Sequence, residues 1–383
     1  MSLKFVVLLY YMLCSVITYF IVSLSGNYGS SVGFKVAEKN SILFNDLIFG
    51  VLASYIIVYV FYRNIVKINL RVRFTTHLKL IDIFALLCIS INTLTIMLDI
   101  GKAGGGISKI GFLQSLIPLI PCMILYFSIV RDKVNRLRIC IIFIFVLLGL
   151  LKGWSGHVIL LVLLESLYRF KNRISFRALF KLFILFLCII LIFYFIIPLK
   201  FAIRGGGFTL VSISDYSLYI FGRVGIFSVY SYLSSISNEF VGVLSHSNIL
   251  VVFIKEYFLG VIPKSLIGMS DFKGLDNLFS VNFINPELPN AGFSITLPGL
   301  YKLAGSDLVT IFILTIFLLF IFIFQWSLLS SVTSSRLASN ALFVNLLSFV
   351  GSGSLKSVAL FNYILVLYLI YSLFFSLILL RKK

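Results

Sequence analysis

The sequence predicts an all-α, polytopic integral membrane protein, and three observations carry this prediction. The 383-residue chain is 60% hydrophobic and only 12% charged, and its mean hydropathy of +1.11 is far above that of a soluble domain. Its apolar residues form separate stretches, several of them long enough to cross a hydrocarbon layer of roughly 30 Å as a helix. Its basic residues gather in the short segments between alternate stretches, as expected for a bundle that crosses a membrane repeatedly.

About ten membrane spans follow from the hydropathy. No small-residue cleavage site follows the first apolar stretch, so we expect an uncleaved helix there rather than a signal peptide. The stretch 182–199 holds neither a charge nor an amide, and 308–326 is nearly as apolar. The predicted spans lie at about 5–24, 43–62, 80–99, 111–130, 139–153, 156–169, 182–199, 308–326, 338–352 and 358–380.

The basic residues orient these spans. If the N-terminus is cytoplasmic, the segments on that side hold 19 of the 32 Lys and Arg, packed into short loops and the C-terminal tail. The external side holds the other 13, seven of them in one large loop that would be translocated largely regardless of its charge. We therefore expect both termini in the cytoplasm.

Two pairs of spans depend on short breaks. Residues 139–167 could form one long helix, but a single crossing would put the basic segments 131–138 and 169–181 on opposite faces, so we expect a helical hairpin. The basic residues at the C-terminus are expected on the cytoplasmic side, so the same argument predicts two separate spans, 338–352 and 358–380. The first of that pair is short and could instead re-enter the membrane from one side.

We expect a single integral membrane domain over residues 1–383, in three parts. Residues 1–199 hold about seven spans, 200–306 form the large external loop, and 307–383 hold about three spans. Within the loop, the pattern predicts a helix from Ser214 or Asp215 to about Ser235 and a second helix over 247–258. A re-entrant helix in 247–263 is an open alternative, and 271–292 reads as irregular chain.

Several function classes lack their motifs. The sequence contains no P-loop, no Asp-x-Asp pair for a Mg²⁺-dependent nucleotide-sugar enzyme and no G-x-S-x-G elbow. The histidines at 77, 157 and 246 have no metal-ligand spacing, and the five cysteines fall inside predicted spans at unrelated spacings. The net charge of +19 is explained by helix orientation and anionic lipid, so we expect no nucleic-acid partner.

The candidate site lies in the external loop. Arg204 and Arg223 are the arginines of the external side, and Arg is the side chain that grips a phosphate with two parallel hydrogen bonds. Arg204 also precedes three glycines, whose backbone N–H groups would suit an anion. Lys264 and Lys273 could add positive potential. For all four, a surface role remains the alternative.

Carboxylates of the same loop are candidates for a general base. Asp271 and Asp276, in the irregular segment, are the best placed, whereas Glu256 beside Lys255 reads as part of a solvated helical face. Four further acidic residues lie at or near span ends, close enough to the interface to be solvated: Asp46, Asp82, Asp99 and Glu165.

The overall plan resembles the Wzy-type O-antigen polymerases, which have ten to twelve spans and a dominant periplasmic loop in the second half. The local matches are Phe221-Gly-Arg-Val-Gly-Ile-Phe227, Ile262-Pro-Lys264, the polar stretch 290–299 and the Gly-Trp-Ser-Gly turn at 153–156. They cover about thirty residues. The turn lacks the arginine that related proteins often carry, and Lys152 would have to serve.

The resemblance implies a glycosyltransferase of the GT-C type in the bacterial inner membrane. It would join undecaprenyl-diphosphate-linked oligosaccharide repeat units at the periplasmic face, without a metal, nucleotide or other cofactor. Arg223, Asp271 and Asp276 would be its catalytic residues, and Arg204, Arg223, Lys264 and Lys273 would bind the diphosphate. Its partners would be the lipid-linked donor and acceptor, membrane lipids and a chain-length regulator protein.

Two alternatives stay open at this point. An O-antigen-type ligase would share the fold and the donor and would use a different acceptor. A lipid-linked oligosaccharide flippase, or another transporter, belongs to a different class and would be expected to carry polar residues inside its helices.

Overall fold

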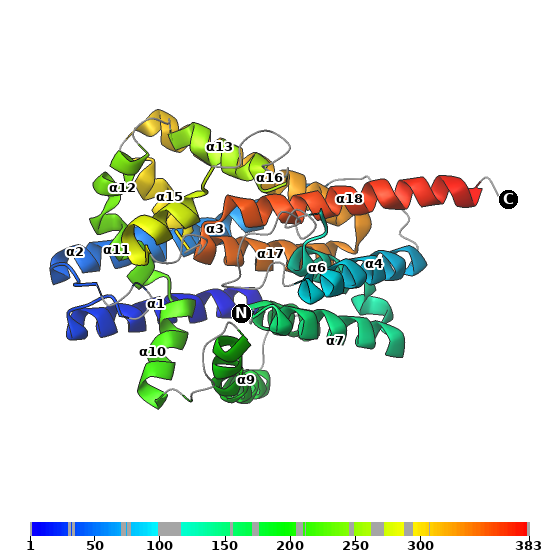
Figure 1. Ribbon diagram of the computed structural model, residues 1–383, viewed down its shortest axis with the longest axis horizontal. Helices are drawn as coiled ribbons and strands as arrows, with labels where there is room; N and C mark the ends of the chain where they lie inside the picture. Colours follow the sequence, from blue (N-terminus) through cyan, green and yellow to red (C-terminus); the bar gives the residue numbers. More distant parts are fainter. Residues whose placement is uncertain are drawn as a thin grey trace.

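The computed structural model describes residues 2–29, 32, 35–69, 74, 78–98, 116–153, 156–170, 176–203, 210, 212–244, 249–261, 272–286, 294–305 and 307–380. Within these ranges every regular element is a helix, apart from one isolated bridge between Asn27 and Val36. The prediction of an all-α protein is therefore confirmed. Figure 1 shows most of the long helices running along the longest axis of the molecule.

Five helical stretches in the described part of the chain are long and apolar enough to cross a membrane. They match the predicted spans 5–24, 43–62, 80–99, 308–326 and 358–380. They are α1 (Leu3–Ser25), the continuous run of α2 (Asn40–Asn45), η2 (Asp46–Leu52) and α3 (Ala53–Ile65), α4 (Leu78–Met97), α16 (Leu308–Val332) and α18 (Leu355–Leu380).

The other predicted spans are also helical, and four of them are shorter or more polar. For the span predicted at 111–130, residues 111–115 lie outside the described residues, and the helix begins at Leu119. The helix α9 covers the predicted 182–199 within 28 residues. These helices are α6 (Leu119–Val130), α7 (Arg136–Leu151), α8 (Gly156–Arg169), α9 (Phe176–Ile203) and α17 (Ser335–Ser352).

The predicted hairpin is confirmed by the two separate helices α7 and α8, which contact each other. Arg131, just after α6, is 2.6 Å from Glu165 on α8, and Glu165 is 2.5 Å from Arg169. The two basic segments thus meet at one end of the bundle. We call this the basic end; it carries Lys4, Arg131, Glu165 and Arg336. The opposite end, where α1 finishes and α16 begins, is called the loop end.

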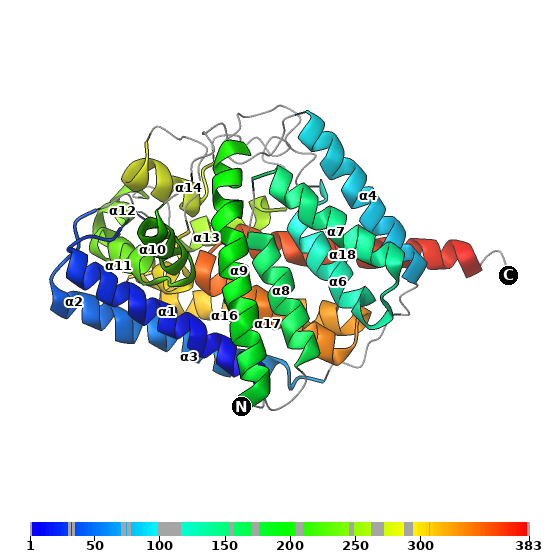
Figure 2. The ribbon, with the colours of Figure 1, turned by 90° about the horizontal axis from the view of Figure 1, so that it is seen from below.

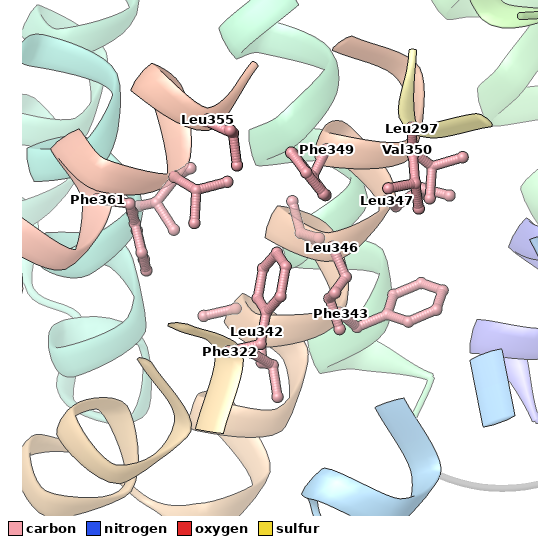
Figure 3. Close-up of a cluster of buried hydrophobic side chains, with 14 of the residues drawn as sticks. Leu297, Phe322, Leu342, Phe343, Leu346, Leu347, Phe349, Val350, Leu355 and Phe361 are labelled. Atoms are coloured by element: carbon pink, nitrogen blue, oxygen red, sulfur yellow. The ribbon is translucent and has the colours of Figure 1, made fainter. Parts of the chain in front are cut away.

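Helix α17 is the centre of the bundle. It contacts α3, α6, α8, α15, α16 and α18, and Figure 3 shows its apolar side chains packed toward Phe322 of α16 and Leu355 and Phe361 of α18. Its 18 residues span about 27 Å at about 1.5 Å per residue. It runs from Arg336 at the basic end to Ser352, whose carbonyl accepts hydrogen bonds from Ile295 and Thr296 at the loop end. The helix is continuous over 338–352, and both a full crossing by this segment and its re-entrant alternative stay predictions.

The segment 200–306 forms short helices at the loop end: α10 (Ile213–Val224), α11 (Phe227–Ser235), α12 (Ser237–Val243), α13 (Ile249–Leu259), α14 (Leu275–Phe279), η5 (Ser280–Ile284) and α15 (Leu297–Leu303). In Figure 1 α11, α12 and α15 lie toward the left, where α15 contacts both α11 and α12. The helix expected through 214–235 breaks near Gly225, where a Cβ would lie 2.5 Å from Thr18 Oγ1 and 2.7 Å from the Cys14 carbonyl oxygen. Close packing against α1 thus divides this helix.

The irregular reading of 271–292 is wrong for its middle, which forms α14 and the π-helix η5. Residue 271 and residues 287–293 lie outside the described residues. The second loop helix is confirmed as α13, whose contacts with α18 hold it against the bundle.

Candidate functional site

Three of the predicted site residues, Arg204, Lys264 and Asp271, lie outside the described residues. The backbone of Arg223 belongs to α10, but its side chain also lies outside the described part. Lys273 is exposed, and Asp276 is half-buried in the first turn of α14, where its Oδ1 accepts a hydrogen bond from Asn277 N at 2.8 Å. The described residues therefore do not gather the predicted set into one site.

Glu256 does not belong to a solvated helical face, as its position next to Lys255 suggested. It is 4% exposed, and its Oε2 accepts a hydrogen bond from Leu275 N at 3.2 Å. It therefore stabilises the start of α14, since the first N–H groups of a helix have no partner inside the helix. A Cβ at Gly274 would lie 2.9 Å from Asp276 Oδ1 and 3.7 Å from Glu256 Cδ, so the two carboxylates face one short turn.

A cavity of about 500 Å³ lies between η2–α3, α15, α16 and α17. Its wall is mostly apolar and its polar lining includes one cation, Lys302. Two lining residues are strongly exposed at the outer surface of the helices, Phe49 at 77% and Ile57 at 65%, so the cavity opens sideways from the bundle. The lining residues are Phe49, Gly50, Ser54, Ile57, Val58, Phe61, Tyr230, Leu297, Pro298, Tyr301, Lys302, Gly305, Ile311, Thr315, Leu318, Phe322, Leu346 and Phe349.

The wall on the η2 side depends on Gly50. A Cβ at this position would lie 2.0 Å from Cε1 of Tyr230, so only glycine lets the phenol ring lie against the helix. The surrounding residues form a π-helix, a local widening that occurs often at functional sites. Burial and the negative charge of Asp46 raise the pKa of Tyr230 to about 12, so its hydroxyl stays neutral.

Helix α15, which carries Lys302, is placed by a strained turn. Thr296 has a φ of +69°, and among the described residues it is the one non-glycine residue with a positive φ. Its hydroxyl caps the helix by accepting a hydrogen bond from Gly299 N at 3.3 Å. Gly353, also at positive φ, lies so close that a Cβ there would be 2.6 Å from the Thr296 carbonyl oxygen. The contact between this turn and the end of α17 therefore sets where Lys302 stands.

A buried carboxylate lies next to the cavity. Asp46 is 9% exposed, and its Oδ2 accepts a hydrogen bond from Ser231 Oγ at 2.6 Å, while Oδ1 accepts from Ser234 Oγ at 3.2 Å. Lys302 is close enough for its charge to attract that of Asp46. The expectation of a solvated Asp46 is therefore wrong. Its position inside an apolar span was the available signal, since ionisable residues in membrane helices are costly and usually have a partner.

The arrangement suits an amphipathic ligand. An apolar chain can enter sideways between α3 and α16, while an anionic head can lie at the loop end near Lys302. Ser54, Tyr230, Tyr301 and Thr315 line the cavity and carry hydroxyls that can hydrogen-bond polar groups of such a head. Among the described residues no three of His, Cys, Asp and Glu lie close enough together to hold a metal ion.

No family model matches this sequence, and no curated protein and no solved structure matches it either.

Proposed function

We propose that the protein is a glycosyltransferase that joins polyprenyl-diphosphate-linked oligosaccharide repeat units at the external face of the membrane, as an O-antigen polymerase does. One observation supports this most strongly: an apolar cavity that opens sideways from the helices and carries Lys302 at its loop end. A polyprenyl-diphosphate substrate has the same division into a long apolar tail and an anionic head.

In the proposed reaction a hydroxyl oxygen of the acceptor sugar attacks the anomeric carbon of the donor. The bond between that carbon and the diphosphate oxygen breaks, the acceptor proton passes to a base, and polyprenyl diphosphate leaves. Negative charge grows on the leaving oxygen, so Lys302 would stabilise the transition state more than the ground state. Arg204, Arg223, Lys264 and Lys273 remain proposed contacts of the diphosphate, and Asp271 and Asp276 remain proposed bases.

The proposal includes a topology of about ten crossings with the loop end in the periplasm and both termini in the cytoplasm. The contacts at the basic end support it, because they join residues of α1, α3, α8 and α17 that the charge distribution assigns to one side. A periplasm-active reporter fused after Lys273 should be active, and the same reporter fused after Lys133 should be inactive. The reverse pattern would overturn the topology.

The decisive experiment uses the purified protein with a synthetic polyprenyl-diphosphate repeat unit and neither metal nor nucleotide. We expect a ladder of products spaced by one repeat. No ladder, under conditions in which a known polymerase of this type works, contradicts the proposal. In cells, deletion of the gene should leave lipopolysaccharide with at most one repeat unit.

The ligase and flippase alternatives give other outcomes. Loss of a ligase would cause lipid-linked polymer to accumulate, and no polymer would be attached to the lipid core of lipopolysaccharide. Loss of a flippase would trap single lipid-linked repeat units on the cytoplasmic face. One observation favours a transporter as second candidate: Lys152 is fully buried, and its Nζ donates to Asn92 Oδ1 at 2.7 Å. A normal polymer ladder in the purified system would exclude that candidate.

A further inference from the structure

Cations from distant parts of the chain converge at the basic end. Lys4 lies in the first turn of α1 and Arg336 in the first turn of α17, so 331 positions of sequence separate residues whose charges interact. The interaction between them is repulsive. The N-terminus of the chain lies at the lower edge of Figure 2, where α1 begins.

The ammonium of Lys4 is held by two neutral hydroxyls. Its Nζ donates to Tyr62 Oη at 2.5 Å and to Ser339 Oγ at 2.6 Å, and these two oxygens are themselves 2.5 Å apart. Tyr62 and Ser339 are buried, which fixes the lysine in place. An ammonium has three N–H donors, so these two contacts leave one for a further acceptor.

Arg336 lies one turn before Ser339 on the same face of α17. Its guanidinium donates to the carbonyl oxygen of Tyr168 and lies 4.9 Å from the centre of the Tyr168 ring. The guanidinium of Arg131 lies 4.2 Å from the centre of the same ring. Two arginines therefore share one aromatic side chain, and Lys4 of α1 contacts the next turn of α17 through Ser339.

Carboxylates are too few here to balance these charges. The cytoplasmic segments and the adjoining helix ends contain three acidic residues, Asp82, Asp132 and Glu165. Asp82 pairs with Arg138, and Glu165 pairs with both Arg131 and Arg169. The described ion pairs include none for Lys4 or Arg336. The first turns of α1 and α17 contain no acidic residue, so the helix dipoles add to the positive potential.

We propose that Lys4 and Arg336, with the hydroxyls of Tyr62 and Ser339, bind the phosphate of an anionic phospholipid at the cytoplasmic surface of the membrane. A phosphodiester has one negative charge and several oxygen atoms that accept hydrogen bonds. It would therefore supply the anionic partner that the described ion pairs do not give to Lys4 and Arg336. The site lies at the ends of membrane helices, and exposed apolar residues of α1, Leu9 and Leu13, follow it toward the bilayer. The head of a phospholipid would lie at the two cations, and its acyl chains would lie along the exposed apolar side chains of α1. The proposal does not depend on the proposed enzymatic function.

Binding can be measured on the purified full-length protein by native mass spectrometry with phosphatidylglycerol and, separately, with phosphatidylcholine. We expect retained phosphatidylglycerol adducts that decrease about tenfold in K4Q/R336Q. The matched control R63Q/K67Q removes two exposed cations of the same end and should leave the adducts unchanged. The variant K4R/R336K keeps both positive charges and should preserve most of the preference for phosphatidylglycerol. Retention of lipid by this variant would also show that substitutions at these two positions leave the protein folded.

Three results would overturn the proposal. The first is equal retention of phosphatidylglycerol and phosphatidylcholine by the wild-type protein. The second is an equal loss of adducts in K4Q/R336Q and in R63Q/K67Q, which would show diffuse attraction to the basic surface. The third is displacement of the lipid by millimolar inorganic phosphate or glycerol 3-phosphate, which would identify a site for a soluble anion instead of a lipid.

Discussion

The two ends of the bundle use charge in different ways. At the loop end one cation, Lys302, stands at the opening of an apolar cavity, beside a buried carboxylate that accepts hydrogen bonds from two serines. At the basic end many cations lie close together, and their partners are hydroxyls, an aromatic ring and the two carboxylates of Asp82 and Glu165. The loop end therefore places one charge at a cavity, whereas the basic end uses most of its charge to join helices. Variants at each end can test this difference.

The largest effect is expected for Lys302→Glu at the loop end. In the proposed reaction, reversal of the charge would replace attraction of the diphosphate by repulsion. A charge-assisted contact worth about 2–3 kcal/mol corresponds to a loss of roughly 100-fold in polymerisation rate. The measurement is the product ladder of the purified protein. Lys255→Glu, an exposed position on α13, is the control and should remain active. Equal rates for both variants would remove Lys302 from the site.

At the basic end the largest effect should come from Arg138→Gln. Arg138 of α7 is 3.0 Å from Asp82 of α4, and their side chains are 10% and 14% exposed. The hydroxyl of Tyr126 donates a hydrogen bond to the same carboxylate at 2.9 Å. Removal of one partner of a buried pair leaves an uncompensated charge, at a cost of about 3 kcal/mol. Thermal unfolding in detergent would measure it. A neutral result would mean that this pair is solvated.

The shape of the cavity can be tested at Gly50. In Gly50→Ala the new methyl group would collide with the Tyr230 ring, and we expect destabilisation of about 1–3 kcal/mol, read as a lower unfolding midpoint. Tyr230→Ala is itself destabilising, but the double variant Gly50→Ala/Tyr230→Ala should lose less stability than the sum of the two single variants, because the methyl group no longer meets the ring. Gly242→Ala, at a helical glycine with open space around it, is the control. Equal effects of both glycine variants would contradict the packing.

The smallest effect is expected for Arg169→Gln at the basic end. Arg169 is 69% exposed and forms an i,i+4 pair with Glu165, which also binds Arg131. Exposed helix pairs are worth about 0.3–0.5 kcal/mol and weaken with salt. The unfolding midpoint should barely change, and any change should vanish at about 1 M salt. If Arg169→Gln lowered the unfolding midpoint as much as Arg138→Gln, the solvent exposure of an ion pair at this end would not predict how much the pair stabilises the protein.

The predicted set of site residues illustrates the limit of the sequence. Arg204, Arg223, Lys264 and Lys273 share only the segment 200–306 and a positive charge, and neither property fixes which of them lie together. Lys302 belongs to the same segment and carries the same charge as these two arginines and two lysines, yet nothing in its local sequence marks it. Its position by the cavity depends on the turn at Thr296 packing against Gly353, which are 57 residues apart in the chain.

Asp46 and Glu256 show the same limit for carboxylates. The sequence predicts a solvated Asp46 near the end of a span and a solvated Glu256 beside Lys255, yet both are buried in the structure. What buries them is a distant partner: Ser231 and Ser234 for Asp46, and the backbone of Leu275 for Glu256. A hydrogen bond between segments far apart leaves no periodic pattern in either one.

By itself the sequence determined the helical class, the five long apolar helices and the hairpin at α7 and α8. These follow from the burial of backbone polar groups and from the distribution of basic residues, and both act along the chain. Only the tertiary structure decided that the polar helix α17 is the centre of the bundle and that a cavity lies between η2–α3, α15, α16 and α17. It also decided that Lys4 and Arg336 come close enough to repel each other. These depend on packing between segments, because the free energy of a buried contact depends on its neighbours in space and not on its neighbours in sequence.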